Sequence, residues 1–221
     1  MKHEEVLAQT SFFAETPATT LATIASHATT QQLQRGDVLF SEGDAPDALF
    51  LVLSGRIAIA VDNKPLDARE SVLALMETGD LFGELGLLDN GERSAMARAI
   101  ETSSVLRIPY EPVIEHMRSN PAMLWGVAKL LATRLRTMDE VLSDSVFLDV
   151  TGRTAKRLLE LSGGNDEFVL PVTQEELAGM VGASRERVNK AIASFIRLGW
   201  LEQHDRRYHI LMRDRLEVRS S

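Results

Sequence analysis

Apolar residues recur at alternating intervals of four and three between Pro121 and Val146, the longest stretch of the chain that keeps a helical period. With a rise of about 1.5 Å per residue, such a helix would be roughly 38 Å long. A narrow stripe fits either a core helix of one globular domain or a helix that packs along a second helix. The charged residues around the stripe favour parallel pairing of two copies, and hence a homodimer. The predicted seam consists of Leu124, Ala128, Leu131, Leu135, Met138 and Leu142.

Between about Gln31 and Pro109 the pattern changes to short apolar runs separated by turns that contain glycine. Many short strands at this spacing are typical of an antiparallel barrel or sandwich. The predicted strands are Val38 to Phe40, Leu49 to Leu53, Ile57 to Val61, Val72 to Met76, Ala95 to Ile100 and Val105 to Ile108.

Helical segments flank this region. Residues 3–28 predict one or two short helices, and residues 111–118 predict another before the long helix. After the long helix the apolar stripe stops within residues 147–153, where Gly152 interrupts the pattern. We therefore expect a hinge and a domain boundary there.

The remainder of the chain has the pattern of a small module with two adjacent helices. A helix over residues 153–161 and a short strand at 168–170 precede helices at 174–181 and 184–198. Only Gly182 and Ala183 separate the last two helices, which is the signature of a helix-turn-helix. Residues 200–202 and 208–212 predict a hairpin, the wing of a winged helix.

The second of these helices has a polar face suited to reading DNA. Val188, Ile192 and Phe195 share its buried side. Arginine and lysine can pair with guanine, and glutamate can accept from cytosine N4. A solvated charged surface is the alternative, but the short turn and the wing favour DNA reading. The predicted DNA-binding residues are Ser184, Arg185, Glu186, Asn189 and Lys190, with Thr173 capping the first helix near a phosphate.

The amino-acid composition limits the class of protein to which the chain can belong. The chain has 221 residues, 44% apolar and 25% charged, as in an ordinary globular protein. No apolar run of 18 residues and no signal-peptide pattern is present, which predicts a cytoplasmic protein without a membrane partner. The absence of cysteine excludes disulfides, thiolate metal sites and a cysteine nucleophile.

The net charge of −8 is unevenly distributed. Residues 1–150 hold 12 Lys and Arg against 22 Asp and Glu, whereas residues 151–221 hold 12 against 10. A slightly basic C-terminal module beside an acidic N-terminal region fits a nucleic-acid reader joined to another domain.

A second motif with candidate chemistry runs from Phe82 to Ala95. Two glycines around Glu84 let the backbone approach a ligand and expose amides, as a phosphate-holding loop requires. Arg93 supplies a positive fork for an anion and Ser94 a hydroxyl. Ordinary turn glycines, with Arg93 in a surface ion pair to Glu84 or Glu92, are an equally good interpretation of the spacing alone.

The 82–95 stretch resembles the phosphate-binding cassette of the cyclic AMP receptor protein and fumarate–nitrate reductase regulator (CRP/FNR) superfamily. The resemblance continues, in the same order, through residues 147–153 and 181–186, so it covers essentially the whole chain. It implies an α+β fold: an N-terminal antiparallel, jelly-roll-like β-roll that binds cyclic nucleotides, a long dimerisation helix and a C-terminal winged helix-turn-helix. The implied boundaries are 1–117, 118–146, a hinge at 147–152 and 153–221.

The resemblance also implies roles for single residues. Gly83 and Glu84 would hold the ribose hydroxyl, while Arg93, Ser94 and the amide of Ala95 would hold the cyclic phosphate. Leu85 is assigned to the same ligand-binding loop. Arg185, Glu186 and Lys190 match positions that read TGTGA-type half-sites, although arginine is frequent where this chain has Lys190.

The chain departs from the family pattern in the middle of the long helix. Members that respond to cyclic AMP place a hydroxyl residue and a small polar residue there, against the adenine, and this chain has Met138 and Asp139. Methionine cannot donate that hydrogen bond, whereas Asp139 can accept one from an adenine amine. Cyclic AMP is the expected effector, and a vestigial or different sensor with constitutive DNA binding is the alternative.

Other branches of the superfamily, and enzymes, fit the sequence less well. Without cysteine the chain cannot carry the iron–sulfur cluster of one branch, and its five scattered histidines suggest no haem ligand set. Neither a GxxxxGK[ST] loop nor a GxSxG elbow is present, so we expect no enzyme activity, on cyclic nucleotides or otherwise, and no metal. The expected partners are double-stranded DNA, a second copy of the chain, a cyclic nucleotide and, from the resemblance, RNA polymerase.

Overall fold

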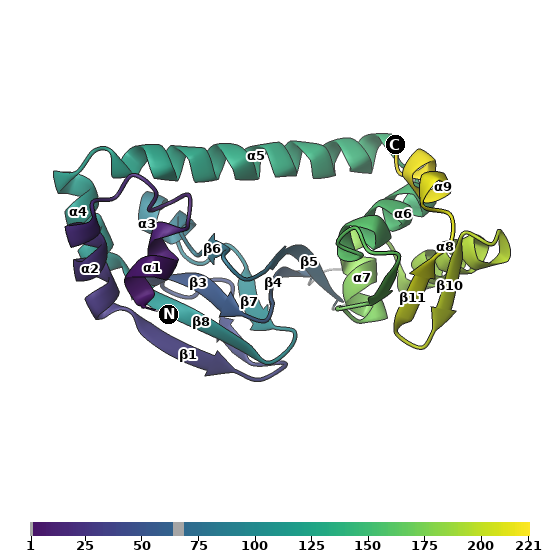
Figure 1. The fold of residues 1–221 in the computed structure, drawn as a ribbon, viewed down its shortest axis with the longest axis horizontal. Coiled ribbons are helices and arrows are strands. Elements are labelled where there is room, and N and C mark those ends of the chain that lie inside the picture. The colour runs from purple at the N-terminus through teal and green to yellow at the C-terminus, as the bar shows by residue number, and fades with distance from the viewer. Residues whose placement is uncertain (1, 64–68) are drawn as a thin grey trace. The chain divides into compact units, whose positions relative to one another are not determined.

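The structure is a computed structural model that describes residues 2–63 and 69–221 (Figure 1). It divides into two compact units. The first comprises Met1–Val61 with Leu73–Arg136, and the second comprises Asp62–Val72 with Thr137–Ser221. Each unit has its own secondary structure and core.

Two four-stranded sheets form most of the first unit. One sheet has the order β1-β8-β3-β6 and the other β2-β7-β4-β5. The pairings of β1 and β3 with β8, of β3 with β6, and of β2 and β4 with β7 are antiparallel, which confirms the predicted antiparallel fold. The strands are β1 (Thr29–Leu33), β2 (Val38–Phe40), β3 (Ala48–Ser54), β4 (Ile57–Asn63), β5 (Arg69–Met76), β6 (Leu81–Phe82), β7 (Met96–Ala99) and β8 (Ser103–Pro109).

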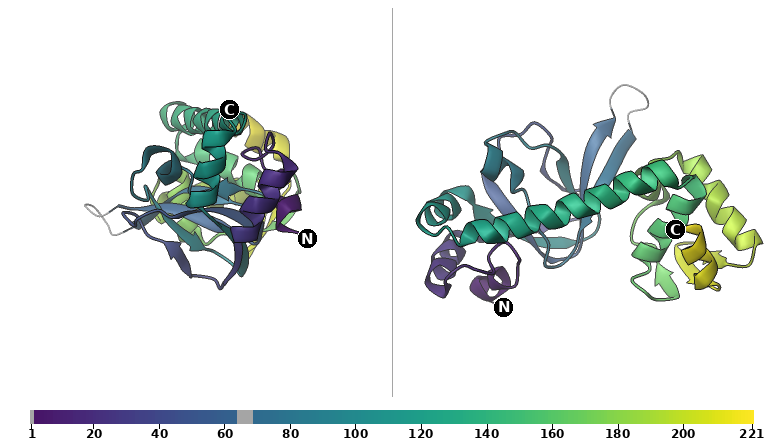
Figure 2. Two further views of the ribbon diagram at one scale, coloured as in Figure 1. Left: turned by 90° about the vertical axis from the view of Figure 1, so that its left-hand side faces the viewer. Right: turned by 90° about the horizontal axis from the view of Figure 1, so that it is seen from above.

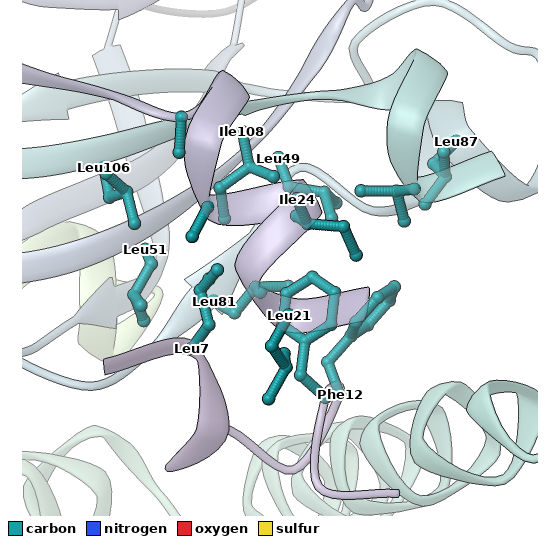
Figure 3. Packing of buried hydrophobic residues seen from close by; sticks show 14 of the residues in the cluster. Leu7, Phe12, Leu21, Ile24, Leu49, Leu51, Leu81, Leu87, Leu106 and Ile108 are labelled. Atoms are coloured by element: carbon teal, nitrogen blue, oxygen red, sulfur yellow. The ribbon is translucent and has the colours of Figure 1, made fainter. Parts of the chain in front are cut away.

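Strand β3 is buried on both faces and so serves two cores. Because side chains alternate along a strand, Leu49 and Leu51 point to one side, and Phe50 and Val52 to the other. The first pair packs with the N-terminal helices, as Figure 3 shows around Ile24. The second pair packs between the two sheets with residues of β4, β7 and β8.

Helices α1 (His3–Ala8), α2 (Ala18–His27) and α4 (Tyr110–Ser119) cover the first of these cores, and α3 (Leu85–Asp89) lies between β6 and β7 in the chain. Leu7 of α1, Leu21 of α2 and Val113 of α4 are all buried in it. The predicted helices over residues 3–28 and 111–118 are therefore confirmed, whereas α3 lies in a stretch for which the sequence predicted only a loop.

The long helix α5 runs from Met123 to Phe147 without a break (Figure 2). Only Met123, Gly126 and Val127, close to its start, are buried. A side chain at Gly126 would place its Cβ 2.3 Å from the carbonyl oxygen of Phe12, so glycine permits the first turn to pack closely against the chain between α1 and α2. All six residues of the predicted seam are exposed in the single chain, with Leu135, Met138 and Leu142 each more than 60% exposed. The interpretation of this stretch as a core helix is therefore wrong.

The second unit is a winged helix-turn-helix, as predicted. Its elements are α6 (Val150–Leu161), β9 (Glu167–Val169), α7 (Gln174–Val181), α8 (Arg185–Arg197), β10 (Leu201–His204), β11 (Arg207–Ile210) and α9 (Arg213–Arg219). The three strands form one antiparallel sheet of order β10-β11-β9. Leu158 of α6, Leu177 of α7 and Phe195 of α8 are among the buried side chains of this unit.

Gly152 does not interrupt a helix, and that expectation is wrong. Asp149 caps α6, its carboxylate accepting from the Gly152 amide at 2.8 Å, so Gly152 lies in the first helical turn. A Cβ at this position would lie 2.9 Å from the backbone oxygen of Arg219 on α9. The glycine therefore serves close packing between α6 and α9, a helix that the sequence did not predict.

Candidate functional site

Arg93 is a buried cation in the first unit, with 6% of its surface exposed. Its Nη1 donates to the carbonyl of Gly83 and to the hydroxyl of Tyr110, both at 3.1 Å, and its Nη2 donates to the carbonyl of Ala48 at 2.8 Å. The centre of the guanidinium lies 4.2 Å from the centroid of the Phe40 ring. This burial excludes the interpretation of Arg93 as a surface ion-pair residue.

The hydrogen bonds of Arg93 leave part of the guanidinium unused. An arginine has five N–H donors, and the three bonds engage both protons of Nη1 and one of Nη2. In the part of the chain that the structure describes, its Nε is buried and has no hydrogen-bond partner. The remaining donors, on Nε and Nη2, match what two oxygens of a phosphate require.

Gly83 must be glycine for this arrangement to exist. Its φ of +83° lies in the left-handed region that side chains disfavour. In addition, a Cβ at Gly83 would lie 2.7 Å from Nη1 of Arg93 and 3.3 Å from the oxygen of Ala48. The loop therefore brings its backbone close to the guanidinium of Arg93.

Glu84, nine residues before Arg93 in the sequence, is fully buried and pairs with another arginine. Oε1 of Glu84 bonds Nη1 of Arg134 on α5, whose Nη2 donates to the carbonyl of Leu81 at 2.7 Å. Among the described residues, Oε2 of Glu84 has no partner. A ribose hydroxyl could donate to that oxygen, so the residues present fit the sugar phosphate that the loop is predicted to bind.

The structure places the other predicted ligand-binding residues as follows. Leu85 is the first residue of α3 and is exposed, as is Ser94, whereas Ala95 is buried between Ser94 and β7. Met138 and Asp139 are both exposed on α5, in the half of that helix that belongs to the second unit. The first unit therefore brings together Gly83, Glu84 and Arg93 around one set of buried polar atoms.

The hydroxyl of Tyr110 is part of the same cluster and was not predicted from the sequence. Tyr110 is 8% exposed, and its hydroxyl donates to the carbonyl of Gly83 while accepting from Arg93. Burial raises the pKa of Tyr110 above its usual value, an effect that the Arg93 charge opposes. The hydroxyl is therefore neutral at physiological pH.

In the second unit, α7 and α8 are joined by a short turn, and α8 has a polar face that is exposed to solvent. Thr173 and Glu176 form a capping box at the start of α7, Gly182 has a φ of +65° in the turn, and Ser184 caps α8 through the Arg187 amide. Val188, Ile192 and Phe195 are buried, as predicted. The side chains of Arg185, Glu186, Asn189 and Lys190 are all exposed, as is Arg187, which the sequence prediction did not include.

Two of these exposed residues form an ion pair along the helix. Nζ of Lys190 lies 2.7 Å from Oε1 of Glu186, and the two side chains are 74% and 76% exposed. The hydrogen bond from Lys190 lowers the pKa of Glu186 below its usual value. The carboxylate is therefore ionised and able to accept a hydrogen bond from a cytosine amine.

Sequence reasoning missed Arg134 and Tyr110 because their partners lie far away in the chain. Glu84 is 50 residues from Arg134, and Gly83 is 27 residues from Tyr110. Periodicity predicts which helix face a residue occupies but not which distant side chain it meets. The one available signal for Arg134 was a cation near the middle of the long helix, where it was interpreted as a flank of the apolar seam.

Comparison with known proteins identifies the family of the chain. Residues 30–120 match the family model of the cyclic nucleotide-binding domain, and residues 152–219 match the Crp-like helix-turn-helix domain. These two domains define a DNA-binding transcription regulator with a domain for cyclic nucleotides, a class of regulators and not of enzymes. The chain belongs to the CRP/FNR family.

Individual relatives cover most of the chain. A CRP-like cAMP-activated global transcriptional regulator of Mycobacterium tuberculosis is 33% identical over 98% of this chain and 99% of its own. A cyclic AMP receptor protein of Thermus thermophilus is 37% identical over 72% of each chain. The solved structure of the c-di-GMP responsive global regulator CLP of Xanthomonas campestris is 26% identical, with a TM-score of 0.76 over 88% of this chain and 99% of that one.

Two other features are absent from the described residues. No group of three or more His, Cys, Asp or Glu side chains there is placed to hold a metal ion. No helix in that part of the chain is long and apolar enough to span a membrane.

Proposed function

We propose that this protein is a homodimeric transcription regulator in which a cyclic nucleotide, cyclic AMP, controls binding to palindromic TGTGA-like DNA sites. The observation that carries the proposal is the buried pair of unsatisfied polar groups, Nε of Arg93 and Oε2 of Glu84. Buried polar atoms of native proteins are seldom without partners, and a charged atom least of all. A cyclic phosphate on Arg93 and a ribose hydroxyl on Glu84 would satisfy both.

Ser94 and the amide of Ala95 would add donors to the same phosphate, with Leu85 and Gly83 shaping the loop around it. The names of the Mycobacterium and Thermus relatives support cyclic AMP as the effector. The name of the Xanthomonas relative shows that effectors differ within similar folds. Comparing cyclic AMP with cyclic GMP tests the base contact, because Met138 and Asp139 replace the pair expected against adenine.

The exposed stripe on α5 supports the dimer. Leu135, Met138 and Leu142 repeat at three and four residues and expose 61%, 68% and 64% of their surfaces in the single chain. A contiguous apolar stripe of this length on a protein surface indicates a partner, and a second α5 has the matching pattern. Two recognition helices related by a two-fold axis would then read half-sites about 34 Å apart. A contact with RNA polymerase belongs to the same proposal.

Control of DNA binding requires that the nucleotide bind the DNA-competent state more tightly than the other state. The neutral Met138 can stabilise the α5 seam without nucleotide, which favours the alternative of constitutive DNA binding. The two alternatives differ in whether DNA affinity depends on nucleotide.

Calorimetric titration with cyclic AMP, and with cyclic GMP for comparison, tests the sensor. We expect micromolar or tighter binding of cyclic AMP, abolished by Arg93→Ala because the phosphate loses its only buried cation among the described residues of the loop. Glu92→Gln, an exposed neighbour, is the matched control and should bind as the unmodified protein does. No heat and no change in melting temperature with either nucleotide would contradict the sensor.

Fluorescence anisotropy of a labelled TGTGA palindrome, at one fixed salt concentration, then tests whether the nucleotide controls DNA binding. The proposal expects tighter binding with cyclic AMP than without it. Equal affinity in both conditions would leave constitutive DNA binding as the function.

A further inference from the structure

We propose that Tyr110 is a positioning residue for nucleotide binding, whose buried hydroxyl fixes the Nη1 end of Arg93 so that Nε and Nη2 remain directed to the phosphate. The inference rests on the proposed nucleotide site in the first unit and assigns to Tyr110 a role that neither the sequence motif nor the family comparison gave. It concerns a residue that does not itself need to touch the ligand.

Tyr110 is fixed at both of its ends. Its backbone amide, at the start of α4, donates to the carbonyl of Asp47 at 2.9 Å, beside the first residue of β3. Its hydroxyl lies against the carbonyl of Gly83 and receives a bond from Nη1 of Arg93. The tyrosine therefore joins the edge of β3 to the glycine loop through a rigid ring.

This arrangement decides which donors of Arg93 are left over. With Gly83 and Tyr110 both accepting from Nη1, that nitrogen has no proton for a ligand. The carbonyl of Ala48 holds one proton of Nη2, and the Phe40 ring covers one face of the guanidinium. Without the hydroxyl, Nη1 keeps a single acceptor, so the plane of the guanidinium loses one of the three points that define its orientation.

A neutral acceptor suits this task better than a carboxylate would. A carboxylate next to Arg93 would neutralise the charge that attracts the phosphate and would compete for the same donors. Burial instead raises the pKa of Tyr110, so its hydroxyl stays neutral over the physiological range. The positive charge of Arg93 is thereby oriented without being cancelled.

The test compares Tyr110→Phe with the unmodified protein by calorimetric titration with cyclic AMP. Because hydrogen bonds to charged groups are stronger than neutral ones, we expect an affinity lower by about tenfold. Tyr208→Phe is the matched control: Tyr208 is also a buried tyrosine with one side-chain partner, Gln174, but it lies in the second unit and should leave nucleotide affinity unchanged.

A second measurement separates orientation from a general loosening of the site. The two diastereomers of the cyclic AMP phosphorothioate place sulfur at one or the other exocyclic phosphate position. If Tyr110 orients Arg93, their affinity ratio should change in Tyr110→Phe, whereas a loosened site should weaken both diastereomers alike. Equal ratios and equal cyclic AMP affinity in the two proteins would overturn the inference.

Two further outcomes are informative. If the unmodified protein binds neither nucleotide, the proposed function fails together with this inference; if it binds and only the variant data disagree, the inference alone fails. If Tyr110→Phe does not fold, nitrogen NMR of Arg93 in the unmodified protein decides, with Arg93→Lys to assign the signal. We expect separate, slowly exchanging Nη1 signals, and a freely rotating guanidinium would count against the role of Tyr110.

Discussion

Each of the two units holds charged residues that we propose for recognition, but the units hold them in opposite ways. In the first unit Arg93 and Glu84 are buried, and carbonyls, a tyrosine hydroxyl and another arginine fix them. In the second unit Glu186 and Lys190 are exposed and bonded only to each other among the described residues. The same side-chain chemistry is therefore rigid in one unit and adaptable in the other.

The difference follows from the size of what each unit binds. A small nucleotide offers few contacts, so each must be pre-positioned if the affinity is not to be lost in ordering flexible side chains. A DNA duplex brings many phosphates, and these position the protein independently of the base-reading side chains. Substitutions should accordingly cost folding stability in the first unit and mainly recognition in the second.

The largest effect should come from breaking the buried pair between Glu84 and Arg134. Arg134→Met leaves the buried carboxylate of Glu84 without its cation. Because an unpaired buried charge is unfavourable, the unfolding free energy should fall by about 3 kcal/mol. Arg134 is itself 31% exposed, which is why we take the lower end of the usual range. Urea unfolding at one fixed protein concentration measures the loss.

The double variant Glu84→Gln, Arg134→Met is the control for that experiment. Removing both charges should recover part of the lost stability, because the penalty arises from the unpaired carboxylate. Equal stability of the single variant and the unmodified protein would mean that this pair does not distinguish the first unit from the second.

An intermediate effect is expected at Asp149, which caps α6 in the second unit. Asp149→Ala should lower the unfolding free energy by about 1 kcal/mol, as loss of a helix cap does, while Asp149→Asn retains an acceptor for the Gly152 amide and should lose less. The hydrogen bond from the Gly152 amide is the main cause of the lowered pKa of Asp149; burial opposes the shift, and Arg219 adds to it.

The pH dependence of this variant follows from the direction of the shift. Because the pKa of Asp149 is lower in the folded than in the unfolded state, its contribution is complete above the usual aspartate pKa of about 3.9 and is lost as the pH falls through the lower, folded-state value. The stability difference between Asp149→Ala and the unmodified protein should therefore be constant near neutral pH and shrink below about pH 4. A difference that stays constant in acid would exclude the carboxylate as its source.

The smallest effect on folding is expected at Glu186. Glu186→Gln removes an exposed ion pair, so the unfolding free energy should stay essentially unchanged. Discrimination against a changed C·G pair in the half-site should fall by about tenfold in competition anisotropy. Glu217→Gln, an exposed glutamate of α9, should change neither quantity. A large loss of stability in Glu186→Gln would remove the contrast between the two units.

Much of the fold was predictable from local patterns. The short apolar runs of β3 and β8 and the glycine between α7 and α8 each suffice to indicate an element and its boundary. Strand β1, with the sequence Thr-Thr-Gln-Gln-Leu, carries too few apolar residues to be detected and forms because β8 supplies its pairing partner. The same reason applies to α9, which has one buried residue, Leu216.

The candidate site was predictable in its residues but not in its connections. The glycine loop and Arg93 stand close together in the sequence, and their chemistry alone suggests an anion. The partners that orient them, Ala48, Tyr110 and Arg134, come from other elements, and only the folded chain brings them together. Gly152 illustrates the converse error: a glycine read as a breaker is required because a distant backbone oxygen comes close to it.

Strand β3 gives the molecule an evolutionary constraint of an unusual kind. Successive residues of this strand face different cores, so a change in volume at Leu49 must be compensated among the N-terminal helices, and one at Phe50 among the strands of the opposite sheet. The carbonyl of Ala48, one residue before Leu49, also holds Arg93. Substitutions at neighbouring positions of β3 should therefore be accompanied by substitutions in separate sets of partner residues. In both sets, changes that move the carbonyl oxygen of Ala48 should be disfavoured, because that oxygen fixes the position of the Arg93 charge.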